Sequence, residues 1–370
     1  MQKPWPILVA ILCLSAAGCK KSEVQLPAER PKIRIQEGYS ETFIKALQQQ
    51  DEAIRSASPN MNFAQVQSIR SVLRTWPNKR VIKVAFKGGN AELGKQISLA
   101  VKPWTDAANI TFDFGLDPTT ANYREWTTSD TDYRADVRIS FDSSPEPGYW
   151  SAVGRDSIKP SLRPPNIASM NFQGFTEELA DDWQATVLHE FGHALGFEHE
   201  HQSPNSPCEP EYRWSDDPGY IPTQNMYHEF VADNQGRKPG IYTVLGGAPN
   251  RWSKEQIDFN LKQFAPSTDW YLTPFDPSSI MKYAFPDWMY RDVEVSTKSG
   301  CYGPPSLVLS AEDQKGAATA YPRDPQSAEH LLDEKLRVSQ EVLALKKLSP
   351  QLRFEFNSIA GDLQKAKRQK

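Results

Sequence analysis

Residues 189–199 read HEFGHALGFEH, and this stretch says more about the chain than any other. On a helix, His189 and His193 lie on one face a single turn apart, so their imidazoles can reach the same metal ion. Gly196 suits the left-handed conformation that ends a helix, and the turn would let His199 return to the ion. Three neutral imidazoles predict a zinc site with an open coordination position.

Glu190 directly follows the first of these histidines and is not one of the expected ligands. It can point into a cleft and take a proton from the attacking water, whose pKa zinc lowers towards 7. The pattern uses three of the six histidines in the chain. We put its chance occurrence at roughly one in a hundred thousand or less. The alternative, histidines that fill a core helix, is disfavoured because core helices seldom carry Glu between two His.

The stretch resembles the HExxHxxGxxH motif of the metzincin zinc peptidases, and residues 279–283 (SIMKY) resemble the S-x-M-x-Y turn of their astacin family. The resemblance implies that Met281 forms an apolar floor below the histidines. It also implies that Tyr283 is a further zinc ligand that swings away when substrate binds. A phenol beside the metal is a suitable hydrogen-bond donor to the oxyanion of a tetrahedral intermediate. The alternative interpretation makes Met281 and Tyr283 unrelated core residues.

The likeness covers roughly residues 76–322. It includes residues 148–154 (GYWSAVG) and a closing-helix stretch at residues 309–321 (LSAEDQKGAATAY). The sequence departs from the family pattern in two places. Residues 201–204 (HQSP) replace the Arg-x-Asp-Arg-Asp run of the family, and no F-x-G-D latency motif precedes the domain. We expect His201 to be a solvent or loop histidine, since one more ligand would close the open metal position.

The resemblance implies an α+β, two-lobed metzincin fold. A mixed twisted sheet and two long helices would lie above the cleft, and an irregular lower lobe would contain the Met-turn. Periodicity predicts strands at residues 80–86, 110–114, 135–141 and 167–172, and helices at residues 91–107 and from Asp181. We expect the strand at residues 167–172 to be the edge strand that pairs antiparallel with an extended substrate.

Changes in composition divide the chain into four segments. They are a signal peptide (residues 1–18), a polar tether or pro-like segment (19–75), the catalytic domain (76–323) and a charged helical tail (324–370). The second segment holds two weakly amphipathic stretches, at residues 41–56 and 63–73.

The N-terminus has the pattern of an export signal. Lys3 precedes the apolar run WPILVAILCL (residues 5–14), which is too short to span a membrane, and the small residues SAAG lead to Cys19. A Cys after Ala-Ala-Gly resembles the bacterial lipoprotein signal, in which this Cys is lipidated. The residue after Cys19 is Lys20 rather than Asp, and in this respect the sequence resembles Gram-negative lipoproteins that are exported to the outer membrane. We therefore expect Cys19 to anchor the protein to a membrane of the bacterial cell envelope; the alternative is a secreted protein.

Two cysteines remain in the body of the chain, Cys208 and Cys301, because Cys13 would leave with the signal and Cys19 would carry lipid. In an oxidising compartment such a pair favours one disulfide. Free thiols or thiolate zinc ligands are the alternatives, although neither Cys has another Cys or a His at finger-like spacing.

The overall composition fits a globular enzyme. Of the 370 residues 39% are hydrophobic, which is enough for a sizeable core, and the net charge of −4 offers no basic stripe for nucleic acid. We expect a zinc-dependent endopeptidase that hydrolyses extended protein or peptide substrates, with Glu190 as general base. One rival is a lipoprotein that keeps zinc for structure and only binds peptides. The other is an envelope protein whose C-terminal helices, at residues 328–348 and 351–365, dock a partner.

Overall fold

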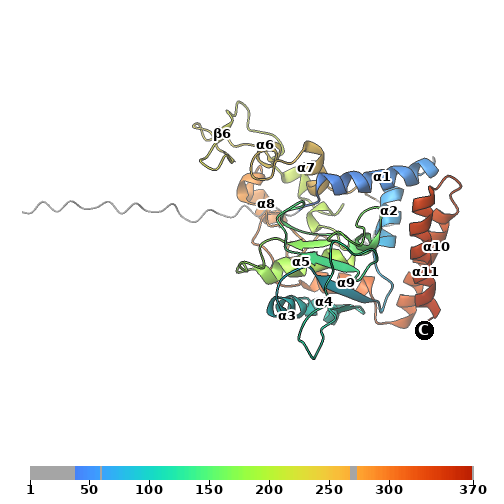
Figure 1. Cartoon of the computed structure of the whole chain (residues 1–370). Helices are drawn as coiled ribbons and strands as arrows, with labels where there is room; N and C mark the ends of the chain where they lie inside the picture. The colour runs from blue at the N-terminus through green and yellow to red at the C-terminus, as the bar shows by residue number, and fades with distance from the viewer. Residues whose placement is uncertain (1–37, 59–60, 267–272, 369–370) are drawn as a thin grey trace, which may run out of the picture. The chain divides into compact units, whose positions relative to one another are not determined.

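A computed structural model describes residues 38–58, 61–266 and 273–368 (Figure 1). The expected signal peptide and Cys19 lie outside these residues. Within the described residues, no helix combines the length and the apolar character needed to cross a membrane.

A five-stranded mixed sheet, in the order β2-β1-β3-β5-β4, forms the centre of the fold. Its strands are β1 (Val81–Phe86), β2 (Thr111–Asp113), β3 (Val137–Ser140), β4 (Tyr149–Ser151) and β5 (Met170–Phe172). The strand pairs β1–β2, β1–β3 and β3–β5 are parallel, whereas β4 runs antiparallel to β5. Together with the surrounding helices, this mixed sheet confirms the expected α+β class.

The position of β5 contradicts one expectation. The strand predicted at residues 167–172 is not an edge strand, because β5 is paired on both sides, with β3 and with β4. The edge strand is β4, which precedes β5 in the chain but lies outside it in the sheet. All three residues of β5 are buried, as expected for an interior strand.

Three helices complete the main core: α3 (Ala91–Ala100), α4 (Lys102–Ala107) and α5 (Trp183–Leu195). The helix predicted over residues 91–107 is divided at Val101, because Pro103 has no N–H to donate and is suited to the first turn of a new helix. On α5, Phe191 meets the β2 residue Phe112 edge to face, with ring centroids 4.9 Å apart. The two expected long helices are thus α5 and a helix in two parts.

The region after α5 consists of short helices and loops. Its helices are α6 (Ile241–Gly246), α7 (Lys254–Leu261), α8 (Val293–Ser299) and α9 (Ala311–Ala320), and its small hairpin pairs β6 (Thr223–Gln224) with β7 (Phe230–Val231). Cys208 and Cys301 are joined by a disulfide whose Cα atoms lie 5.3 Å apart. This covalent link between distant loops stabilises a region with little regular secondary structure.

Four further helices form a second apolar cluster beside the main core. They are α1 (Glu41–Ala57), α2 (Phe63–Arg74), α10 (Pro325–Leu343) and α11 (Pro350–Arg368). Figure 1 shows α10 and α11 side by side, next to α2. Val66 of α2, Val342 of α10 and Leu363 of α11 are almost completely buried in this cluster. The described part of the segment expected as a tether or pro-like region therefore forms two packed helices.

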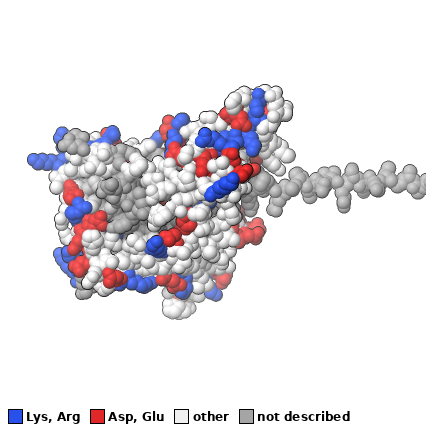
Figure 2. Space-filling view, turned by 180° about the vertical axis from the view of Figure 1, so that it is seen from behind, with Lys and Arg blue, Asp and Glu red and all other residues white. Residues whose placement is uncertain are grey.

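The described part of the chain contains both buried and solvent-exposed ion pairs. Arg70 of α2 contacts Asp51 of α1 at 2.5 Å, with both side chains buried. On the face shown in Figure 2, positive and negative side chains are intermixed. Exposed pairs such as Lys367–Asp333 are screened by solvent, so they contribute little to stability.

Candidate metal centre

The helix α5 brings the first two histidines of the motif into the core. Its apolar residues Val187, Phe191 and Leu195 are fully buried, so they fix how the helix is rotated. The helix ends at Gly196, whose φ of 105° is the left-handed conformation that favours glycine. A Cβ atom at Gly196 would also lie 2.9 Å from the Cγ2 atom of Thr75, so the turn has no room for a side chain.

The three motif histidines come together as the spacing predicts. His189, His193 and His199 each offer one ring nitrogen, and these atoms lie within 4.8 Å of one another. The Nε2 atoms of His193 and His199 are 3.0 Å apart. The Nε2 atom of His189 is buried and has no hydrogen-bond partner among the described residues.

The other ring nitrogens explain why these atoms point inward. His189 Nδ1 donates to the carbonyl of Ile280 at 2.7 Å, and His193 Nδ1 donates to the carbonyl of Phe197 at 2.8 Å. When Nδ1 carries the proton, the lone pair is on Nε2 and is available to a metal. The site therefore fits a zinc ion, because three Nε2 lone pairs converge and the one on His189 has no hydrogen-bond partner among the described residues.

Burial also favours the neutral form of these rings. The exposed fractions of His189, His193 and His199 are 6%, 3% and 5%. Burial lowers the pKa of His189 to about 3 and the pKa of His193 to about 4, and it lowers the pKa of His199 as well. Neutral imidazole is the form that binds metal.

Gln202 holds the third histidine in place, although it is not part of the zinc-binding motif. Its side-chain oxygen accepts a hydrogen bond from Nδ1 of His199 at 3.0 Å. Its amide group donates to the carbonyl of Phe259 on α7 at 2.8 Å. The only hint in the sequence is a Gln three residues after the third histidine.

The Met-turn lies beneath the histidines. Met281 is buried at 4% exposure, and its sulfur occupies the place that a Cβ atom on Gly192 of α5 would need. Glycine between the two helical histidines therefore allows the turn to approach the helix. Asp313 of α9 fixes the turn, because its carboxylate accepts the Ser279 hydroxyl at 2.6 Å and the Ile280 N–H at 2.8 Å.

Tyr283 and Glu190 lie at the same centre. The ring of Tyr283 is 4.2 Å from the ring of His199 and 5.6 Å from the ring of His189, measured between centroids. Glu190 follows His189 on α5 and is 1% exposed. Glu190 is therefore buried on the helix that carries His189 and His193, and the ring of Tyr283 packs against His189 and His199.

The expectation for His201 is wrong. This histidine is 1% exposed, and its ring stacks 4.8 Å from Tyr283 and 5.1 Å from His199. Its Nε2 donates to the backbone carbonyl of Asn260 on α7 at 3.1 Å. It is buried because α7, which is distant in the sequence, packs over the short helix that carries it (η2, Glu200–Gln202).

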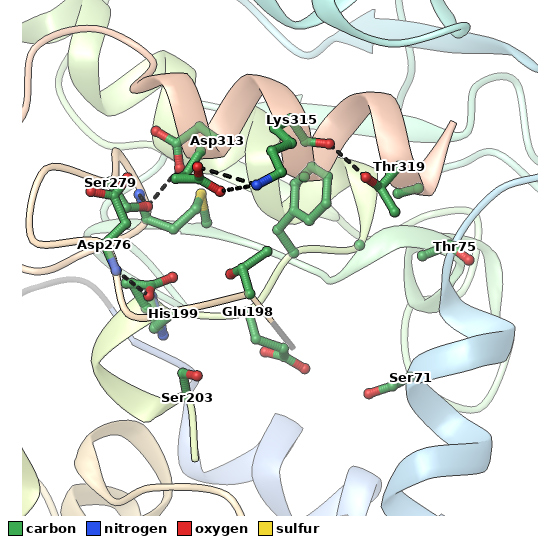
Figure 3. A pocket seen from close by; sticks show the side chains of 18 of the residues that line it. Ser71, Thr75, Glu198, His199, Ser203, Asp276, Ser279, Asp313, Lys315 and Thr319 are labelled. Carbon is green, nitrogen blue, oxygen red and sulfur yellow. Dashed lines mark hydrogen bonds and ion pairs between the residues drawn. The ribbon is translucent and has the colours of Figure 1, made fainter. Parts of the chain in front are cut away.

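A cavity of about 270 Å³ borders the loop that carries His199 (Figure 3). Figure 3 shows Ser71 of α2 and Thr75, which directly follows α2, on one side of it, and Asp313, Lys315 and Thr319 of α9 on another. Two carboxylates of the loop lie on its wall, those of Glu198 and Glu200.

Both carboxylates tie the loop to other parts of the fold. Burial raises the pKa of Glu200 to about 7, and this side chain accepts the Asp276 N–H at 2.9 Å. Glu198 pairs with Arg74 of α2, whose Nε also contacts Asp156 at 2.5 Å. The loop is thus held from the Met-turn side and from α2.

The site is a centre of three converging histidines, with Glu190 buried on the same helix and the ring of Tyr283 packed against His199. Similar solved structures include two of myroilysin. Each is 28% identical to this chain, and each alignment covers 68% of this chain. The alignments cover 97% and 86% of the respective myroilysin chains, with TM-scores of 0.48 and 0.42. Another is high choriolytic enzyme 1, a hatching enzyme zinc-protease from the medaka fish Oryzias latipes. It is 16% identical and covers 66% of this chain and 92% of its own, with a TM-score of 0.34. No protein-family model and no curated protein matches the sequence.

Proposed function

We propose that this protein is a zinc-dependent endopeptidase of astacin-like type that hydrolyses peptide bonds in extended protein or peptide substrates. The observation that carries the proposal is the convergence of ring nitrogens from His189, His193 and His199 within 4.8 Å, on and beside the helix that holds Glu190. Zinc bound there would act as a Lewis acid on the substrate carbonyl and lower the pKa of water at the site.

The residues of the chain supply the remaining chemistry. Glu190 takes the proton from the attacking water and passes it to the nitrogen of the leaving amine. The hydroxyl group of Tyr283 donates a hydrogen bond to the oxyanion that forms on the substrate carbonyl. β4 lies at the edge of the sheet, and an edge strand can offer main-chain groups to an extended peptide, which suits binding that tolerates many sequences.

The test is digestion of a denatured proteome by the zinc-loaded protein, followed by sequencing of the new peptide termini. The wild-type chain and a Tyr39→Ala chain are both used, because Tyr39 binds Asn260 of α7, whose carbonyl accepts from His201 beside the metal centre. We expect new termini with either or both chains, and their loss when a chelator removes the metal. Zinc at full occupancy without new termini from either chain would favour the rival of a zinc-containing binding protein.

We also propose that Cys19 carries a lipid and anchors the protein to a bacterial envelope membrane, and that Lys20 directs it to the outer membrane. The support is the sequence Ala-Ala-Gly-Cys at residues 16–19. A Cys19→Ser variant should stay unprocessed or appear in the soluble fraction. Cys13→Ser is the matched control, since this residue would leave with the signal. Unchanged partitioning of the Cys19→Ser protein into detergent would refute lipidation.

A further inference from the structure

Tyr39 is bound by α7 through its main chain. Its N–H donates to the side-chain oxygen of Asn260 at 2.9 Å. Its carbonyl accepts the side-chain N–H groups of Gln256 at 3.0 Å and Asn260 at 3.4 Å. A side-chain amide that both accepts from and donates to one residue's main chain is suited to holding an extended peptide, since it does not depend on the side chain of that residue.

The side chains around Tyr39 cover the end of the edge strand. Tyr39, Phe43 and Leu47 pack in one buried apolar cluster with Ala152 and Val153, the two residues that directly follow β4. Next to Tyr39, the Ser40 hydroxyl donates to Glu146 in the loop before β4. The start of the described chain therefore bridges α7 and the strand edge at which a substrate would pair.

The residues that hold Tyr39 also contact the metal centre. The backbone carbonyl of Asn260 accepts the hydrogen bond from His201, which stacks on Tyr283 and His199. The neighbouring Phe259 lies 6.0 Å from the Tyr39 ring, edge to face, and its carbonyl accepts from Gln202. Tyr39 thus contacts Phe259, which in turn binds Gln202, the residue that positions the third histidine.

Electrostatics agree with this placement. Burial raises the pKa of Tyr39 well above its ordinary value, and the carboxylates of Glu198 and Glu190 add to the rise. The Tyr39 hydroxyl is buried and makes no hydrogen bond within the part of the chain that the structure describes. The ring, rather than the hydroxyl, therefore accounts for the fit.

We propose that Asn260 and Phe259 form a substrate subsite of the peptidase, and that Tyr39 of the same chain fills this subsite in the form described here. This inference rests on the proposed peptidase function. With Tyr39 and α1 displaced, the subsite would be lined by Phe259, Ala152, Val153 and Leu162, which are apolar. It would accept peptides with Phe, Tyr or Leu at this position. It would take Phe at least as well as Tyr, because no described residue forms a hydrogen bond with the Tyr39 hydroxyl.

Peptide binding to an inactive variant tests the subsite separately from catalysis. A labelled peptide with the sequence of residues 38–47 (GYSETFIKAL) is added to the zinc-loaded Tyr39→Ala/Glu190→Gln protein, and its fluorescence anisotropy is measured. The same peptide with Ala in place of Tyr should bind roughly ten- to a hundredfold more weakly, since it loses the buried ring. Adding Asn260→Ala should weaken binding of both peptides. Equal affinity of the two peptides, or no binding, would overturn the inference.

Cleavage of a fluorogenic peptide tests the covering role of Tyr39 in the full chain. We expect Tyr39→Ala to raise the rate about tenfold or more over wild type, with Phe43→Ala as a second variant of the same cluster. Phe354→Ala should leave the rate unchanged, because Phe354 is 67% exposed on α11. In the Tyr39→Ala background, Asn260→Ala should raise KM more than it lowers kcat. Rates that do not rise in either cluster variant would show that Tyr39 does not block the subsite.

The two proposals fail in different ways. If the Tyr-containing peptide binds selectively but zinc-loaded Tyr39→Ala protein cleaves nothing, the peptidase function is wrong and the subsite remains. If the protein cleaves peptides but the two labelled peptides bind alike, the function remains and the subsite is wrong.

Discussion

The ring of Tyr283 lies 4.2 Å from the ring of His199, centroid to centroid, at an angle of 53°. This packing places the phenol at the metal centre and keeps it 8% exposed. A phenol in this position can form a hydrogen bond to charge that develops only during the reaction.

Tyr283→Phe keeps the ring and removes the hydroxyl, so stability and zinc content should barely change. Turnover on one peptide, measured in the Tyr39→Ala background at matched zinc occupancy, should fall roughly a hundred- to a thousandfold, which corresponds to about 2.7–4 kcal/mol for one oxyanion donor. KM should change much less. A loss below about threefold would mean that Tyr283 only packs in the turn.

Glu190→Gln should preserve the fold and the metal, because the amide has nearly the same shape as the carboxyl group. It should lower turnover by several orders of magnitude, because an amide cannot take the proton. The matched control is Glu177→Gln, a change on an exposed side chain that should have no effect. Near-normal turnover of Glu190→Gln would exclude Glu190 as the base.

Gln202→Leu removes the acceptor that holds Nδ1 of His199. Loss of such an outer hydrogen bond typically costs about ten- to a hundredfold in metal affinity, and we expect a loss of this size. Competition with a chromogenic zinc chelator measures it. The exposed Gln235 provides the control variant Gln235→Leu, and His193→Ala should lose most of the zinc. Equal zinc affinity of the wild-type and Gln202→Leu proteins would contradict the assigned role.

Lys335 should give the stability of the protein a distinct pH dependence. It is buried on α10, where its ammonium group donates to the Trp76 carbonyl at 2.9 Å. Burial lowers the pKa of Lys335 to about 7, and the nearby Arg155 contributes in the same direction. In the unfolded chain a Lys keeps its proton up to about pH 10.

Between these two values the unfolded state binds more protons, so the free energy of unfolding should rise with pH. The slope due to this group is at most about 1.4 kcal/mol per pH unit. Chemical denaturation from pH 7 to 10 should therefore show a steeper rise for wild type than for Lys335→Met. The exposed Lys365 provides a control, Lys365→Met, which should behave like wild type. Parallel curves for all three proteins would argue against a lowered pKa of Lys335 in the folded state.

The sequence by itself determined the part of the site that is local. The two helical histidines, Glu190 and the turn at Gly196 lie within eleven residues, and helix periodicity with one left-handed glycine is sufficient to bring His199 back to them. The Met-turn was found by resemblance. The pairing of Cys208 with Cys301 followed from counting cysteines, and the structure contains this disulfide.

Only the tertiary structure decided what depends on segments far apart in the chain. Strand order is set by pairing between distant segments, so the edge position of β4 could not be read from the alternation pattern. His201 is buried, and Gln202 positions His199, only because α7 packs against them from more than fifty residues away. Periodicity found the helices α1 and α2, but their faces match α7, α10 and the end of β4 only in the folded chain. Local patterns encode which groups can bind a metal, whereas packing between distant segments decides what surrounds and covers them.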